Sequence, residues 1–109
     1  HLNNPKGGMG LNGGIHDAVN LAEKLTAVWK GEGDASLLDL YTRQRHKAST
    51  DFTQAQTIAN KKQLEERDPE QRKKRLDDLR RVGEDKEQAK AYMRRAQLID
   101  SVKAAADVA

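Results

Sequence analysis

The residues best suited to chemistry lie in a glycine-rich run that leads directly into a helical pattern. Residues 5–14 read PKGGMGLNGG and hold five of the eight glycines of the chain. Glycine permits positive φ and removes the side chains that would keep a planar or anionic ligand away from the backbone. A helix beginning near Asn12 would direct its unpaired N–H groups and the positive end of its dipole at such a ligand. The run therefore predicts a ligand site built from main chain; a glycine-rich turn with a helix cap is the alternative.

Neither of the two common glycine motifs describes this run. A P-loop for phosphate ends in Gly-Lys-Ser/Thr, whereas Gly10 is followed by Leu11 and Asn12. The dinucleotide-binding fingerprint can be laid over residues 8–13, but it should follow a hydrophobic strand, and only residues 1–4 precede the loop. Spacing alone therefore does not identify the ligand.

The amino-acid sequence of the run resembles a motif of a known family. Residues 1–25, HLNNPKGGMGLNGGIHDAVNLAEKL, closely resemble the second flavin-binding motif of the FAD-dependent aromatic hydroxylases, which include 4-hydroxybenzoate hydroxylase and the polyprenyl-methoxyphenol hydroxylases. That motif reads roughly Gly-x-Gly-x-Asn, a few residues, then Asp-Ala-x-Asn-Leu-Ala-x-Lys-Leu. Residues 37–45 are similar to the family's Leu-x-x-Tyr-x-x-x-Arg helix. Lys6 and Glu23 depart from the pattern, where many relatives carry a small or apolar residue and an aromatic residue, respectively.

The resemblance implies that the chain is a piece of a larger protein. The family's Gly-Asp-Ala-Ala would lie immediately before His1, and its N-terminal βαβ unit and substrate-covering sheet have no counterpart here. We expect an all-α fold, a four-helix fragment preceded by a Gly-rich loop and cut from a larger α/β FAD-binding (Rossmann-like) monooxygenase. Residues 1–33 would be the end of the FAD-binding domain, with the flavin loop and the first helix, and residues 34–109 a C-terminal helical region.

The resemblance also implies a reaction. In the family, NADH or NADPH reduces FAD, and the reduced flavin uses O₂ to hydroxylate an activated, phenolic ring. The parent would thus be an oxidoreductase with FAD as cofactor, NAD(P)H as reductant and a small aromatic substrate, while the fragment alone would be inactive and would not hold FAD. A non-enzymatic helical interaction module, with the glycine run as a flexible arm, is the alternative.

The site residues implied by the resemblance are all in the loop and the helix start. The backbone N–H groups of Leu11 and Asn12 would face the pyrimidine edge of the flavin, and Pro5 would lie near its oxygen-reacting side. Gly8 and Gly10 would leave room for the ring. Asn12 could also cap the first helix, and Asp17 would support the loop from within that helix. No residue of this chain is expected to be catalytic in its own right, because the hard chemistry belongs to the cofactor.

Beyond the loop, the periodicity predicts helices only, with no strand and no internal repeat. We expect helices over residues 12–30, 34–66, from Pro69 to about Gly83, and 85–105. Gly31 suits a left-handed C-terminal position, Asp34 and Asp68 suit N-caps, and Gln71 would complete a capping box with Asp68. The inward positions are predicted to be Ile15, Val19, Ala22, Leu25 and Trp29 in the first helix; Leu37, Leu38, Tyr41, Ala48, Phe52, Ala55 and Ala59 in the second; Leu76, Leu79 and Val82 in the third; and Ala89, Tyr92, Met93, Ala96, Ile99 and Val102 in the fourth.

Composition limits the remaining possibilities. Twenty basic and 17 acidic residues leave a net charge of only +3, so the Arg72–Arg75 and Arg80–Arg81 clusters read as solvated helix faces rather than a nucleic-acid surface. The three histidines lack metal-ligand spacing, and no metal site or Ser-His-Asp arrangement is expected. The absence of cysteine fits a reducing compartment, no stretch is apolar enough for a membrane span, and we expect a cytoplasmic protein.

The thin apolar content predicts self-association. One Trp, one Phe and two Tyr are few aromatic residues for a core, and a chain of this size has difficulty burying several amphipathic helices by itself. Copies would pair through long helices, with the second helix as the expected seam.

Overall fold

The computed structural model describes all 109 residues and contains only helices. They are α1 (Gly10–Trp29), α2 (Ser36–Ala48), the π-helix η1 (Ser49–Gln54), α3 (Ala55–Glu65), α4 (Pro69–Glu84), α5 (Lys86–Ala96) and α6 (Ile99–Ala106). The expectation of an all-helical chain is confirmed.

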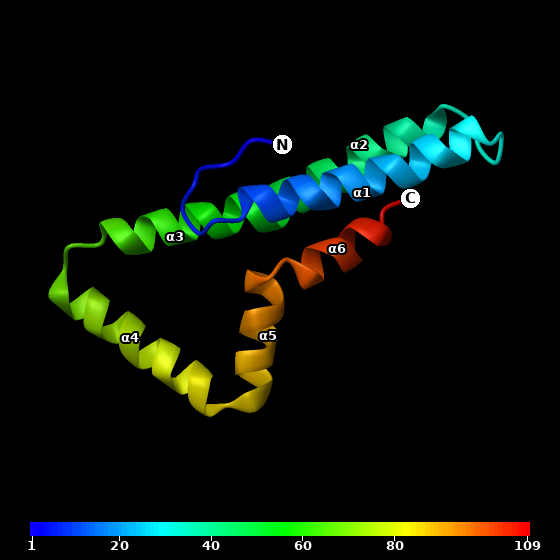
Figure 1. The fold of residues 1–109 in the computed structure, drawn as a ribbon. Coiled ribbons are helices and arrows are strands. Elements are labelled where there is room, and N and C mark those ends of the chain that lie inside the picture. Colours follow the sequence, from blue (N-terminus) through cyan, green and yellow to red (C-terminus); the bar gives the residue numbers. More distant parts are fainter.

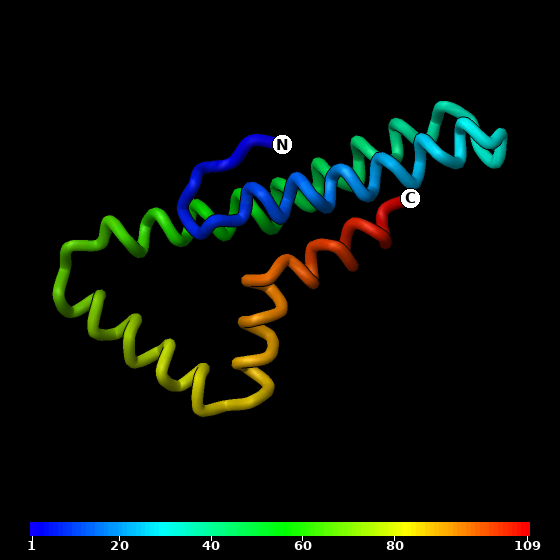
Figure 2. The backbone as a smooth tube through the Cα atoms, in the orientation of Figure 1, coloured from blue at the N-terminus to red at the C-terminus, as the bar shows by residue number.

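Two long helical rods form the main body. α1 lies antiparallel to α2, and α2, η1 and α3 follow one another without a break (Figure 1). α4 leads away from the far end of this rod, α5 runs back toward it, and α6 packs on α2 (Figure 1). In Figure 2, the N-terminal segment runs to a tight turn beside the α2–α3 rod, where α1 begins. The radius of gyration is 17.3 Å, compared with about 13 Å for a compact domain of this length, so the molecule is elongated.

The predicted ends of the helices follow local chemistry. Gly31 adopts φ +72° after α1, and the N–H groups of Gly31 and Glu32 donate to the carbonyls of Val28 and Ala27 at 3.1 and 2.9 Å. This is the Schellman arrangement that favours glycine at the C-terminus of a helix. The predicted N-cap at Asp34 is off by one residue, because Ala35 occupies the N-cap position of α2. The side chain of Asp34 accepts a hydrogen bond from the Ser36 N–H at 2.8 Å, just ahead of the helix.

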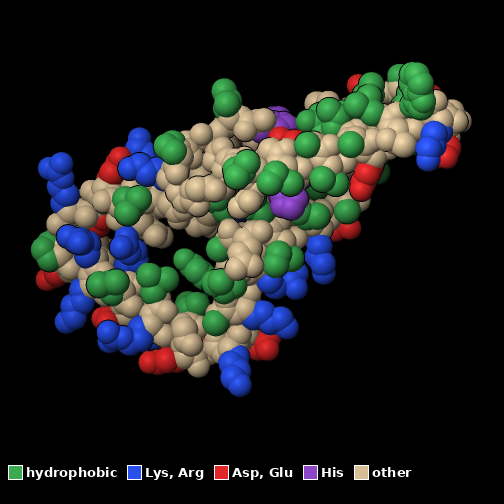
Figure 3. Space-filling model, in the orientation of Figure 1, with side chains coloured by type: hydrophobic (Ala, Val, Ile, Leu, Met, Phe, Trp, Pro, Cys, Tyr) green, Lys and Arg blue, Asp and Glu red, His purple; other side chains and the backbone are tan.

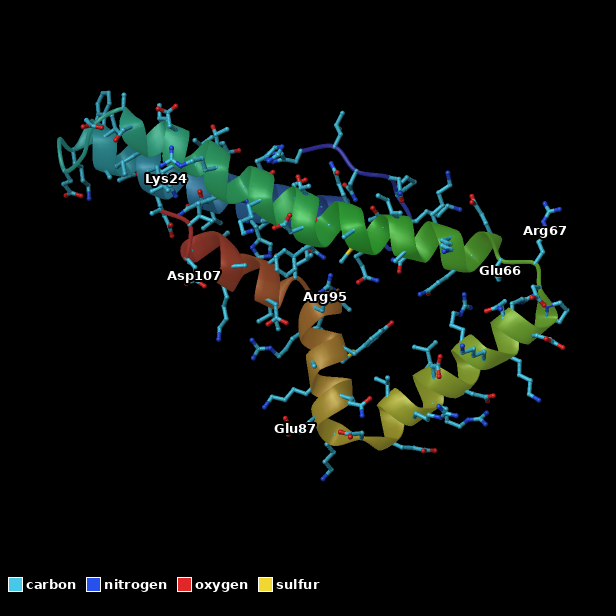
Figure 4. The ribbon with its side chains drawn as sticks, turned by 180° about the vertical axis from the view of Figure 1, so that it is seen from behind. Lys24, Glu66, Arg67, Glu87, Arg95 and Asp107 are labelled. Atoms are coloured by element: carbon cyan, nitrogen blue, oxygen red, sulfur yellow. The ribbon has the colours of Figure 1, made fainter.

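The start of α4 is confirmed only in part. Asp68 caps it by accepting from the Glu70 N–H at 2.9 Å, with Pro69 in the first position. The predicted capping box with Gln71 is wrong, because the N–H of Asp68 donates instead to Oε1 of Glu66 at 2.9 Å. Glu66 and Arg67 mark this corner between α3 and α4 in Figure 4.

The predicted fourth helix is broken in two. Leu98 adopts a left-handed conformation with φ 62°, which ends α5 and starts α6. After the break, Leu98, Ser101 and Ala105 are buried, while the predicted inward residues Ile99 and Val102 are exposed. In α5, before the break, Tyr92, Met93 and Ala96 are exposed as well. The predicted inward face is therefore wrong over both α5 and α6. Arg95 nevertheless ties α5 to the rod, with its guanidinium 5.7 Å from the centre of the Phe52 ring (Figure 4).

The buried face of the α2–α3 rod also differs from the prediction. The buried residues are Ser49 and Thr53 in η1 and Thr57 in α3, whereas Ala55 and Ala59 are exposed. A π-helical segment bonds five residues back instead of four, which shifts the inward side of the rod off the α-helical stripe.

The buried side of α1 is the reverse of the predicted one. The side toward α2 carries His16, Asp17, Asn20 and Lys24, which are half-buried. The predicted apolar face is exposed: Ile15, Val19, Leu25 and Trp29 show between 47% and 90% of their surface. Hydrophobic side chains recur along the α1–α2 pair, while charged ones of both signs crowd α4 and α5 (Figure 3). Only Met9, Ala48, Leu98 and Ala105 form a buried apolar core, so hydrogen bonds and ion pairs take much of the interior.

Candidate functional site

The glycine-rich run forms a tight turn ahead of α1. The N–H of Gly8 donates to the carbonyl of Pro5 at 3.2 Å, and the N–H of Lys6 donates to Oδ1 of Asn4 at 2.9 Å. Gly7 and Gly8 have φ values of +108° and +65°. Both values lie in a region that side chains other than glycine rarely adopt, so the turn depends on these two glycines.

α1 begins at Gly10, two residues before the predicted start. Its first backbone bond runs from the N–H of Gly13 to the carbonyl of Met9 at 2.9 Å, and no side chain caps the helix. The predicted capping role of Asn12 is therefore wrong. As a result, the N–H groups of Gly10, Leu11 and Asn12 have no acceptor within the protein, as expected for the first turn of a helix. Three main-chain donors and the positive dipole end of a 20-residue helix face outward together.

The structure brings the five predicted site residues together at one end of α1. Pro5 and Gly8 close the turn, Gly10, Leu11 and Asn12 form the first helical turn, and all five are exposed. A Cβ placed on Gly8 would meet nothing within 4 Å, whereas one on Gly10 would lie 3.2 Å from Oδ1 of Asn3. The space beside Gly8 is therefore open, whereas a side chain at Gly10 would be crowded by Asn3.

A buried ion pair holds the first half of α1 to α2. Nε of Arg45 lies 2.6 Å from Oδ1 of Asp17, with side-chain exposures of 6% and 14%. His1 Nδ1 lies 2.9 Å from the other carboxylate oxygen of Asp17. Arg45 is a charged residue among the predicted inward positions of the second helix, so periodicity did not indicate this ion pair. The two residues could have been found from the family motifs, because Arg45 is the arginine of the Tyr-x-x-x-Arg pattern and Asp17 is the aspartate of the Asp-Ala-x-Asn pattern.

A polar cluster continues this contact along the helix pair. Oε1 of Gln44 accepts hydrogen bonds from Asn20 at 3.1 Å and from Lys24 at 2.8 Å, and Lys24 also donates to Oδ1 of Asn20 at 2.8 Å. Gln44 in turn donates to the carbonyl of Val108 at 3.0 Å, which holds the C-terminal residues against the pair, close to Lys24 and Asp107 in Figure 4. Burial lowers the pKa of Lys24, and the positive charge of Arg45 adds to this effect while Glu23 opposes it. The cluster was not foreseen from the sequence.

Two further observations concern other kinds of site. No group of three or more His, Cys, Asp or Glu side chains is arranged to hold a metal ion. No helix is both long enough and apolar enough to cross a bilayer.

The glycine turn and the start of α1 lie in a segment that matches a known protein family. A family model described as "FAD binding domain" matches residues 1–56, slightly more than half of the chain. The chain belongs to this family. The match covers the glycine turn, α1, α2, all of η1 and the first two residues of α3, so it includes both helices of the α1–α2 pair. The alternative of a helical module unrelated to flavoproteins loses its basis.

Several curated relatives of this chain are named as aromatic monooxygenases. Para-nitrophenol 4-monooxygenase of Pseudomonas sp. (strain WBC-3) is 44% identical over 72 residues, which cover 66% of this chain and 18% of the relative. Tetracenomycin B2 monooxygenase-dioxygenase of Streptomyces olivaceus is 44% identical over 54 residues, covering 50% and 10%. An uncharacterized aromatic compound monooxygenase of Bacillus subtilis (strain 168) is 47% identical over 60 residues, covering 52% and 12%. No solved structure gave a significant match.

These findings confirm the resemblance to FAD-dependent aromatic hydroxylases. The chain spans less than one fifth of the length of these three relatives. The similarity is therefore to one part of each of these relatives.

Proposed function

We propose that this chain supplies the flavin-ring loop of an FAD-dependent monooxygenase that hydroxylates a phenolic substrate with NAD(P)H and O₂. The observation that carries the proposal is the row of three free N–H groups at Gly10, Leu11 and Asn12. They follow a turn with two glycines at positive φ, inside the segment that matches the FAD binding domain. The names of the relatives support an aromatic substrate.

The residues at the start of α1 fit a flavin. A bound FAD would supply the redox chemistry with O₂ that no side chain of this chain can perform. The N–H groups of Leu11 and Asn12 would donate to the pyrimidine edge of the ring, where negative charge develops upon reduction. The dipole of α1 would stabilise that charge without reorganisation, because its donors are fixed by the helix. Pro5 and Gly8 would border the ring, with no side chain at Gly8 to displace it.

Replacement of Gly10 in the full-length flavoprotein tests this site. In Gly10→Val the Cβ would lie 3.2 Å from Oδ1 of Asn3, and the branched side chain would also enter the space in front of the donors. We expect the purified variant to lose most of its FAD, measured as the ratio of absorbance at the flavin band to that of the protein.

Gly14→Val is the matched control. Gly14 lies one turn further along α1, and a Cβ there would meet nothing within 4 Å. It makes the same change of helix propensity without entering the proposed site. Equal flavin content in the Gly10 variant, the Gly14 variant and the wild type would remove the start of α1 from the flavin site.

A further inference from the structure

A hydrogen bond from Asn60 joins the glycine turn to α3. Nδ2 of Asn60 donates to the carbonyl of Lys6 at 3.4 Å, and this bond joins residues 54 positions apart. Met9, immediately after the turn, is 5% exposed, and Thr57, one turn before Asn60, is 1% exposed. The turn is therefore packed against the rod at this point, and its place is set by α3 as well as by its own backbone bonds.

The amide of Asn60 is held in one orientation. Nε2 of Gln56 donates to Oδ1 of Asn60 at 3.0 Å, which leaves the Nδ2 end facing the carbonyl of Lys6. The reversed amide would set two N–H groups against each other at Gln56 and two carbonyl oxygens against each other at Lys6. The N–H of Lys6 is already engaged by Asn4, so the peptide groups on both sides of Lys6 are fixed.

Gly7 is the point of closest approach. A Cβ on Gly7 would lie 2.5 Å from Nδ2 of Asn60, well inside van der Waals contact, and the φ of +108° is unfavourable for any side chain. Asn60 and Gly7 are thus complementary: the amide occupies the space that the missing Cβ leaves.

The π-helix gives this contact its geometry. η1 shifts the inward side of the rod so that Thr53 and Thr57 are buried, and Asn60 follows Thr57 by three residues, on the same side of the helix. The family match ends at residue 56, so Asn60 lies beyond the segment that defines the FAD binding domain.

We propose that Asn60 is a positioning residue for the flavin loop: through the carbonyl of Lys6 and the close contact at Gly7, it fixes where the free N–H groups of Gly10, Leu11 and Asn12 point. This inference rests on the proposed function. It adds a residue from α3, held by Gln56, to a site otherwise made from the N-terminal turn and α1.

The first test uses the 109-residue chain and Asn60→Asp, which keeps the size of the side chain but removes the donor. Hydrogen exchange followed by NMR should show faster exchange, by about tenfold, at the Gly8 and Gly13 amides, which close the turn and the start of α1. Gln63→Glu is the matched control, because it makes the same amide-to-carboxylate change on an exposed position of α3 and should leave both rates unchanged. Unchanged exchange in the Asn60 variant would overturn the inference.

A second pair of variants tests the contact at Gly7. Gly7→Ala should loosen the turn strongly, because the new Cβ meets the Asn60 amide and φ is strained. Adding Asn60→Ala removes the collision, so the double variant should exchange more slowly at Gly8 than Gly7→Ala alone. A double variant that is worse than Gly7→Ala by the full effect of Asn60→Ala would show independent sites and contradict the contact.

The third measurement is made on the full-length flavoprotein and separates the two proposals. Asn60→Asp should weaken FAD affinity about tenfold, with Gln63→Glu at the wild-type value. A loosened turn with unchanged FAD affinity would overturn the role of Asn60 in flavin binding. If Gly10→Val still removed FAD in that case, the proposed function would stand; if it did not, the proposed function would fail as well.

Discussion

At the scale of residues, the interior of the helix pair depends on Asp17 and Arg45. Both side chains are largely buried and lie 2.6 Å apart. Removing one partner of such a pair leaves a buried charge without compensation, which typically costs about 3–5 kcal/mol. We expect Arg45→Met to lower the free energy of unfolding in urea by about 3 kcal/mol. Asp17→Asn should act in the same direction, and a double variant should lose less than the sum of the two.

An exposed ion pair in the same rod provides the comparison. Lys47 and Asp51 lie 2.7 Å apart, with about half of each side chain exposed, and such pairs contribute about 0.5 kcal/mol or less. Lys47→Met should therefore leave the urea midpoint nearly unchanged. If Arg45→Met and Lys47→Met shifted the urea midpoint equally, burial would not explain the contribution of the Asp17–Arg45 pair to stability.

At the scale of elements, α5 depends on its N-cap. Asp85 accepts hydrogen bonds from the N–H groups of Gln88 and Glu87 at 3.1 and 2.9 Å. These bonds, with the side-chain bond from Gln88, lower the pKa of Asp85. A carboxyl with a lowered folded pKa stabilises the fold above the unfolded pKa, and this contribution is lost as the pH falls through the folded value. We expect helix content to fall below about pH 4, with a smaller fall in Asp85→Asn, which caps without titrating.

Asp107→Asn is the control for this pH dependence. Asp107 follows α6, and its side chain caps no helix, so its replacement should leave the acid transition measured by circular dichroism as in the wild type. If the acid transition of Asp85→Asn coincided with that of the wild type, titration of the Asp85 cap would not contribute to the loss of helix content in acid.

The elements also show what the sequence could and could not predict. Caps and breaks depend on neighbouring residues, so Gly31, Asp68 and Pro69 marked helix ends correctly, and Asp34 lies one residue before the N-cap position of α2. The buried faces were predicted less well. The apolar stripe of α1 identifies a face that needs a cover, but it does not say that the other side will pair with α2 through Asp17 and Asn20.

Two backbone irregularities account for most of the remaining errors. η1 and the left-handed Leu98 each change which side of the following helix faces the interior. A periodicity read from sequence assumes one regular helix, so it cannot anticipate such a change. The glycine turn and the start of α1 were predicted because their signal is local: glycines followed by a helical pattern. Asn60 was not foreseen, because its contact with Lys6 depends on the tertiary path of α3.

At the scale of the whole molecule, the chain exposes more surface than a compact protein of its size. Its accessible area is 8019 Å², compared with about 6,100 Å² for a compact monomer of this mass. The excess is larger than the roughly 800 Å² that each partner buries in a standard protein interface. One exposed apolar face lies on α1, with Leu11, Ile15, Val19, Leu25 and Trp29 on one side of the helix. Because α2 already packs against α1 and α6, whereas the apolar face of α1 is uncovered, we expect copies to associate through α1 rather than through the second helix.

We accordingly expect the chain by itself to self-associate through α1 and to bind no FAD above background. One row of main-chain donors cannot offset the loss of translational and rotational freedom that binding costs. Trp29 is the only tryptophan and is 90% exposed, so its fluorescence should shift to the blue as the concentration rises, in parallel with the mass found by sedimentation. Ile15→Asp should abolish both changes, whereas Thr42→Asp, on an exposed position of α2, should leave them intact. A monomer at all concentrations that titrates FAD with micromolar affinity would contradict both expectations, because it would mean that this chain alone forms a complete flavin site and needs no cover for α1.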